Sequence, residues 1–150
     1  SLFKYLNYMK TLIICITFIW VGMVLGISFL EAPLKFTAPN ITLKLGLGIG
    51  KVVFGALNKI EIIFSLILIT SFFIGNFPLK SNYAYGVVVL ILLMQSLWLI
   101  PVLNHRADLI IAEEKVSESY HHILFIILEL IKLLFLTIAG IKFLNSCKQF

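Results

Sequence analysis

A small set of polar side chains interrupts long apolar stretches of this chain. These are the residues best able to take part in binding or catalysis. Placing an ionisable group in hydrocarbon costs roughly 2.5–3.5 kcal/mol on insertion scales, so such groups usually face a bundle interior or a wet cavity. We therefore predict them to be the ligand-binding or proton-binding residues. The candidates are Glu31, Asn58, Glu61, Gln95, Asn104, His105, Glu129 and Lys132.

Glu61 is the first candidate among them. At mid-depth in an apolar segment, its carboxyl could bind a proton, a cation or the polar head of a lipophilic ligand, and Asn58 could share that task. The alternative is a hydrogen-bonded Glu61 that only locks helix packing. Glu129 and Lys132 are three positions apart, so on one helix they could simply neutralise each other. Trp20 is predicted to be a packing residue.

Four apolar segments must position these residues, and they cover residues 11–30, 52–75, 84–103 and 122–144. A helix needs about 20 apolar residues to cross a bilayer core, so each segment is long enough to span. Only helices and closed barrels satisfy their backbone in lipid, and these runs are continuous rather than alternating. The sequence predicts an all-α integral membrane four-helix bundle with up-down-up-down order, in one domain covering residues 1–150.

The polar residues are expected to share one depth in this bundle. We call the face that holds the N-terminus side A and the opposite face side B. In up-down order the second and fourth helices begin on side B, and the first and third end there. At 1.5 Å rise per residue, four side chains then lie about 12–17 Å from side B: Glu61, Gln95, Glu129 and Lys132. The prediction is a polar cup open to side B, with a dry floor toward side A.

Composition and charge narrow the class of protein. Hydrophobic residues make up 61% of the chain and the mean hydropathy is +1.07, which a soluble domain of this size cannot bury. The net charge of +5 is spread over both faces, so no nucleic-acid partner is expected. All seven acids fall on side B or in the side B half, which favours side A in the cytoplasm. We predict a bacterial inner-membrane protein with cytoplasmic termini, with an organellar membrane as the alternative.

No residue pattern predicts a metal site or a nucleophile. Cys15 and Cys147 have no metal spacing and are expected to be free thiols. His105, His121 and His122 lie at the side B mouth, where two of them could ligate a haem or a metal, but interfacial histidines are ordinary. We predict no catalytic residue, no metal and no cofactor, and keep a haem or a quinone as the alternative.

Two longer polar or glycine-containing segments are predicted to be loops. Residues 31–51 hold the run LGLGIG at 45–50, whose alternating glycines suit a backbone that packs tightly on a neighbour or dips into the headgroup region. Residues 104–120 form the most charged stretch and are too short for an extramembrane enzyme domain.

Three short stretches carry a resemblance to known proteins. GISFLEAPLKF at residues 26–36, followed by VFGALNKIE at 53–61, resembles small uncharacterised bacterial membrane proteins with four spans. Together with PVLNHR at 101–106, it is distantly similar to the four-span family that includes a human transmembrane protein associated with cisplatin resistance. The resemblance implies a four-helix bundle with no assigned reaction, and it carries over no catalytic residue.

Three functions remain open at this point. The first is a non-catalytic bundle, in contact with membrane lipids, whose cup binds a lipophilic ligand or packs against other membrane subunits or a second copy. The second is a small proton-coupled transporter with Glu61 as its titrating group. The third is a membrane enzyme acting on a lipid or quinone, with Glu61 or His105 as acid-base. A non-enzyme is the favoured expectation, and the dry side A half argues against a simple pore.

Overall fold

The structure is a computed structural model that describes residues 1–148, and within that range it is helical with no strands. The helices join into four long runs that are separated by short loops. Each run is long and apolar enough to cross a membrane, as judged by length and composition. The prediction of an all-α chain with four such helices is therefore confirmed. The runs are Leu2–Thr37, Leu43–Ile74, Lys80–Ile111 and His121–Lys148.

Two of the four runs are composite, and the other two are single α-helices. The first run contains α1 (Leu2–Val24), the π-helical η1 (Leu25–Glu31), α2 (Ala32–Leu34) and the 3-10 turn η2 (Lys35–Thr37). The second run is α3 (Leu43–Ile74). The third contains the 3-10 turn η3 (Lys80–Asn82), α4 (Tyr83–Met94), the π-helical η4 (Gln95–Leu99) and α5 (Ile100–Ile111). The fourth is α6 (His121–Lys148).

The helices run further toward side B than the apolar segments do, so the prediction of long loops there was wrong. The first connection is confined to residues 38–42 and the third to residues 112–120. The glycine run at 45–50 is helical, within α3. Thr42 begins this helix, because its side-chain oxygen accepts a hydrogen bond from the Leu45 N–H at 3.2 Å. Gly46 then gives room for the Phe36 ring, which would lie 2.2 Å from a Cβ at that position.

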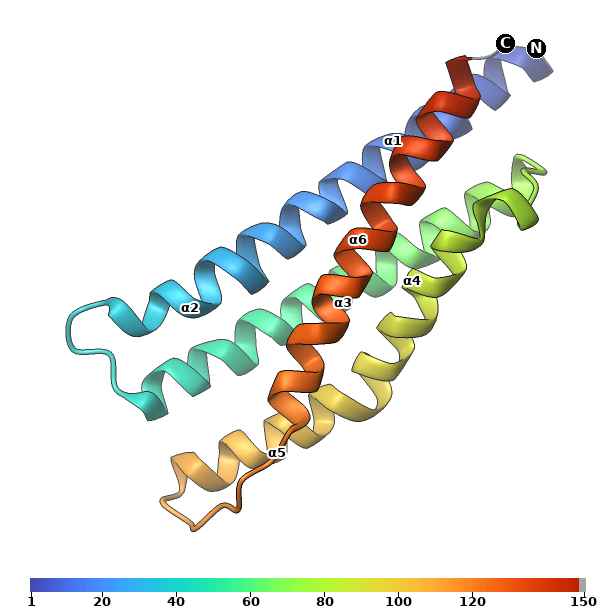
Figure 1. The fold of residues 1–150 in the computed structure, drawn as a ribbon. Coiled ribbons are helices and arrows are strands. Elements are labelled where there is room, and N and C mark those ends of the chain that lie inside the picture. Colours follow the sequence, from blue (N-terminus) through green and yellow to red (C-terminus); the bar gives the residue numbers. More distant parts are fainter. Residues whose placement is uncertain (149–150) are drawn as a thin grey trace.

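Each π-helical segment is closely followed by a proline, Pro33 after η1 and Pro101 after η4. Proline lacks an N–H and its ring clashes with the carbonyl four residues earlier, so a regular α-helix is disturbed there. The two segments adopt bonds over five residues instead: the Ala32 N–H donates to the Ile27 oxygen, and the Ile100 N–H donates to the Gln95 oxygen. The third run bends visibly where η4 joins α5 (Figure 1).

The two ends of the molecule hold different connections (Figure 1). The start of α1 and the end of α6 lie at one end, together with the turn between α3 and α4. The loops at 38–42 and 112–120 lie at the opposite end. Helix α6 packs against α1 and α4, while α3 packs against α1 and α5. We keep the names side A for the end with the termini and side B for the other end.

The side A half is filled by a hydrophobic core. Helices α1 and α6 approach closely at Gly140, where an added Cβ would lie 2.8 Å from the Thr17 methyl carbon. The Thr17 and Tyr85 hydroxyls share a buried hydrogen bond of 2.8 Å, so this half contains one polar pair that the sequence analysis did not anticipate. The largest core side chains here include Ile13, Trp20, Leu68, Phe72, Tyr85, Val88, Leu92, Leu136 and Phe143.

Candidate functional site

Four of the predicted site residues meet in the interior of the bundle. The Lys132 ammonium of α6 lies 2.6 Å from Glu61 Oε1 of α3 and 2.6 Å from Glu129 Oε1 of its own helix. Lys132 also donates to Gln95 Oε1 at 2.8 Å. The Gln95 amide in turn donates to Glu129 Oε1 at 2.8 Å. Residues far apart in the sequence thus form one continuous polar cluster.

Two further residues complete this cluster, and the sequence analysis did not find them. Trp20 Nε1 donates to Glu61 Oε1 at 2.8 Å, and Ser28 Oγ donates to Glu129 Oε2 at 2.7 Å. A buried tryptophan N–H usually finds an acceptor, and that tendency was the available signal for Trp20. All four helical runs contribute to the cluster. We call it the central network: Trp20, Ser28, Glu61, Gln95, Glu129 and Lys132.

Local helix geometry explains why these side chains converge. Glu129 and Lys132 are three positions apart on α6, which places them on one face of that helix. Ser28 and Gln95 both lie in π-helical segments, η1 and η4. The wider π turn is frequent at functional sites. The proline after each segment therefore affects the backbone position from which Ser28 or Gln95 makes its hydrogen bond in the central network.

The central network is almost fully enclosed. Lys132 is 0% exposed, Glu129 and Gln95 are each 1% exposed, and Glu61 is 3% exposed. The polar atoms at the depth where the cup was predicted thus form hydrogen bonds and ion pairs with one another and do not line an open space. An opening toward side B stays a prediction.

The charges of the central network do not balance when every group is ionised. Glu61 and Glu129 bring two negative charges, and Lys132 brings one positive charge. Donors reach both oxygens of Glu129, while Trp20 Nε1 and the Lys132 ammonium reach Oε1 of Glu61. One proton on either carboxyl would leave one carboxylate to balance the charge of Lys132.

The remaining predicted site residues lie outside the central network. Asn58 accepts a hydrogen bond of 2.6 Å from Ser96 Oγ, which links α3 to η4 separately. Glu31 forms an ion pair of 3.5 Å with Lys35. Asn104 is half-buried and His105 is exposed on α5, and neither contacts the network within the described part of the chain.

The side B rim holds ion pairs and aromatic contacts. Lys51 pairs with Asp108 and Lys44 pairs with Glu113, which ties α3 to the end of α5 and the loop after it. The His121 ring stacks on Tyr120, with ring centroids 4.8 Å apart. Within residues 1–148, no group of three or more His, Cys, Asp or Glu side chains could hold a metal ion.

No family model matches this chain, and neither a curated protein nor a solved structure matches it. The resemblance to four-span membrane proteins therefore stays a prediction. Any function must be argued from the central network and from the surfaces around it.

Proposed function

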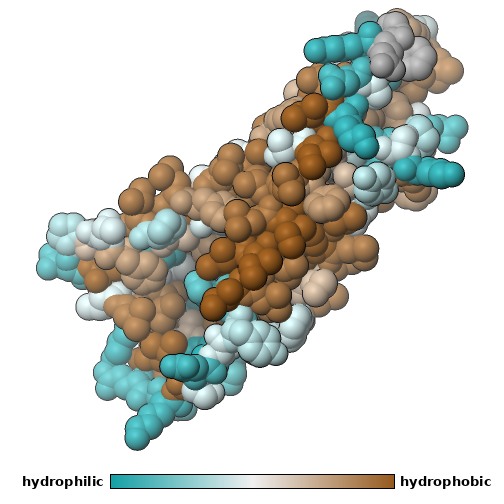
Figure 2. All heavy atoms as spheres, in the orientation of Figure 1, coloured by the Kyte–Doolittle hydropathy of each residue, from teal (hydrophilic) through white to brown (hydrophobic). Residues whose placement is uncertain are grey.

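We propose that the chain is an integral membrane protein, an up-down-up-down four-helix bundle of a bacterial inner membrane with both termini in the cytoplasm. Four apolar helical runs support a membrane location. An apolar band separates more polar ends on the face drawn in Figure 2. Side A, which holds both termini, carries lysines and no acid, and cytoplasmic faces of membrane proteins are enriched in basic residues.

We further propose that this protein is a small proton-coupled transporter and that Glu61 is its proton-binding group. One observation carries the proposal: a single buried ammonium, Lys132, lies 2.6 Å from each of two buried carboxylates. A lock between helices would need only one carboxylate for that lysine. An uncompensated buried charge costs several kcal/mol, so a proton on one carboxyl is the economical way to keep this arrangement inside a membrane.

The proton would change the charge of the network without changing its members. With Glu61 protonated, Lys132 and Glu129 form a neutral pair. After Glu61 loses its proton, the network carries one net negative charge, and this favours contact with water or with a cation. Side B carries the charged rim of Lys51, Asp108 and their neighbours. Transfer of the proton to and from that side is the proposed coupling step.

Infrared spectroscopy tests the resident proton without knowledge of the substrate. We expect protein reconstituted in lipid near neutral pH to show the C=O stretching band of a protonated carboxyl, and Glu61→Gln to abolish it. Glu118→Gln is the matched control, because Glu118 is an exposed loop carboxyl. Absence of the band from the wild-type protein, or its survival in Glu61→Gln, would overturn the proton assignment.

Transport itself needs a second measurement. Proteoliposomes containing a pH-sensitive dye would be given an inward proton gradient, with valinomycin and potassium to balance charge. We expect faster internal acidification with the wild-type protein than with Glu61→Gln, and wild-type behaviour from Glu118→Gln. An infrared band that depends on Glu61, together with no difference in acidification when mixtures of candidate substrates are added, would refute transport and leave a buried structural proton.

The other functions receive less support from this geometry. A lipophilic ligand, a haem or a quinone held by the central network would first have to displace the bonds among Glu61, Gln95 and Lys132. The same holds for a membrane enzyme that uses Glu61 as acid-base. His105, the other acid-base candidate, is exposed on α5 and lies outside the network.

Assembly with other membrane subunits or with a second copy is favoured by a specific observation on α1 and η1. Gly22 and Gly26 are four positions apart, and a Cβ added at either would meet nothing within 4 Å. This is the small-xxx-small spacing that lets transmembrane helices approach one another. We expect Gly22→Leu with Gly26→Leu to reduce chemical cross-linking between copies, while Gly86→Leu, at another open glycine, leaves it unchanged. Equal cross-linking in all three proteins would refute this interface.

A further inference from the structure

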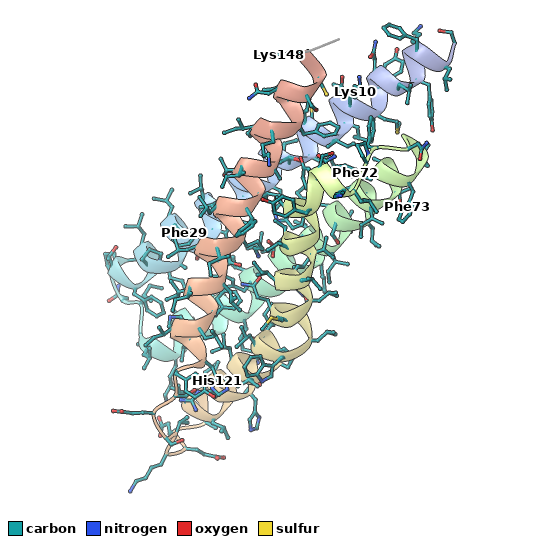
Figure 3. The ribbon with its side chains drawn as sticks, turned by 45° about the vertical axis from the view of Figure 1, so that its right-hand side comes forward. Lys10, Phe29, Phe72, Phe73, His121 and Lys148 are labelled. Carbon is teal, nitrogen blue, oxygen red and sulfur yellow. The ribbon has the colours of Figure 1, made fainter. Side chains whose placement is uncertain are left out.

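A recess lies at the side A end, between α1, the turn that joins α3 to α4, and α6. Its volume is about 480 Å³, within the usual range for small-molecule sites. Leu6, Phe77 and Phe143 supply apolar walls, and Lys10 and Lys142 supply charge from two different helices. Figure 3 shows Lys10 near this end, with Phe72 and Phe73 at the nearby end of α3. The central network lies deeper in the bundle and shares no residue with this recess.

Packing at the turn gives the recess a fixed aromatic wall. Gly75 ends α3, and the Phe77 ring occupies the space where a side chain would begin, because a Cβ at Gly75 would lie 2.2 Å from that ring. Phe77 and Phe143 then meet edge to face, with ring centroids 5.4 Å apart. The Lys142 ammonium lies over the Tyr83 ring, 5.4 Å from its centroid. The shape of the recess therefore rests on buried contacts.

The charge around the recess has one sign. Residues 1–30, 62–107 and 130–150 contain no aspartate or glutamate. Both charged residues that line the recess are lysines. The lysines at this end of the chain are Lys4, Lys10, Lys80, Lys142 and Lys148. The charged side chains that line the recess are positive, so charge complementarity favours a negatively charged ligand.

A second recess, with no charged residue in its lining, adjoins the first. It measures about 450 Å³ and shares Phe77 and Pro78 with its neighbour, while Phe73 and Leu79 give it exposed apolar walls. A recess lined by lysines beside one without charged residues, at the end of membrane-spanning helices, matches a molecule with an anionic head and a hydrocarbon tail.

We propose that the side A recess binds the phosphate-bearing headgroup of an acidic glycerophospholipid, with Lys10 and Lys142 contacting the phosphate and an acyl chain passing by Phe73. Basic pockets between transmembrane helices bind such headgroups by this chemistry. A zwitterionic lipid is less suited, because its own ammonium group would be repelled by the lysines. The proposal depends on the membrane location and is independent of the proton-binding role of Glu61.

Native mass spectrometry of the whole protein, released from mild detergent, tests this site. The probes are phosphatidylglycerol, phosphatidylcholine of the same chain length, and inorganic phosphate. We expect selective retention of phosphatidylglycerol, and an affinity about 30-fold lower in Lys10→Gln with Lys142→Gln, since a lysine near an anionic headgroup contributes about fivefold. The charge-matched control is Lys59→Gln with Lys115→Gln, at exposed lysines away from the recess, which keeps wild-type affinity.

Three results would overturn the proposal. One is equal retention of the two lipids by the wild-type protein. Another is an equal loss of phosphatidylglycerol in the recess variant and the control variant, which would show a non-specific charge effect. The third is displacement of the lipid by millimolar inorganic phosphate, which would assign the recess to a free phosphate. The recess variant must elute as the wild-type protein does in gel filtration, and Lys142→Arg, which keeps the charge, should retain the lipid.

Discussion

The two halves of this bundle are held together by different forces, although the same four helical runs pass through both. On side A the helices approach through a small residue, Gly140, and fill the interior with side chains such as Phe72 and Leu136. Toward side B they are joined through Glu61 and Lys132, whose contacts are ionic. Apolar packing tolerates small shifts, whereas ion pairs at 2.6 Å do not. The side A half is thus stabilised by apolar packing, whereas the central network holds the ionisable groups.

The largest effect is expected from removing the ammonium of the central network. Lys132→Met leaves Glu61 and Glu129 facing each other without a cation, and breaking a buried charge pair costs about 3–5 kcal/mol. We expect a loss of that order in the free energy of unfolding, measured by titration with sodium dodecyl sulfate. Adding Glu61→Gln to this variant should restore part of the loss. A cost of Lys132→Met below about 1 kcal/mol would contradict a charged network, since that is the range of solvent-exposed pairs.

A smaller effect is expected from overfilling the side A core. Gly140→Leu forces a side chain into the contact between α1 and α6, and overpacking costs about 1–3 kcal/mol. The same titration measures it, with Gly86→Leu as the control at an open position. The infrared carboxyl band should stay unchanged in Gly140→Leu, because Glu61 keeps its partners. If the band shifted in Gly140→Leu as much as it does in Lys132→Met, the side A core and the central network would not be independent of each other.

The smallest effect is expected at the buried Thr17–Tyr85 pair of the side A half. Tyr85→Phe removes the hydrogen bond to Thr17, which still donates to the Ile13 carbonyl at 2.7 Å. The expected loss is about 0.5–1.5 kcal/mol, the net contribution of one hydrogen bond. Tyr83→Phe, at an exposed tyrosine, serves as the control. A loss as large as that of Gly140→Leu would mean that the side A half also depends on polar contacts.

Much of this arrangement could be predicted from the sequence, because the cost of polar groups in lipid is so high. That cost alone indicated that Glu61, Gln95, Glu129 and Lys132 share one depth, and the structure brings these side chains into contact. Depth could not specify which faces meet, so Asn58 and Glu31 were grouped with residues that they do not contact.

Two other features could not be predicted from the sequence, for a different reason. The part that Trp20 plays depends on its exact orientation across α1 and α3, which no spacing rule supplies. The first loop was predicted to be too long because the glycine run at 45–50 was assigned to it and not to the second helix. In the structure, the cap at Thr42 and the packing of Phe36 on Gly46 outweigh a helix penalty of about 1 kcal/mol per glycine.

The π-helical segment η4 makes the number of residues in the third run as important as their identity. A π turn accommodates an extra residue, and each residue of an α-helix turns the chain by about 100°. Deleting Leu97, an exposed residue of η4, would remove the extra residue and narrow this turn. Gln95 would then lose the backbone position from which its amide donates to Glu129. Homologous chains should therefore tolerate many substitutions at this point but few insertions or deletions.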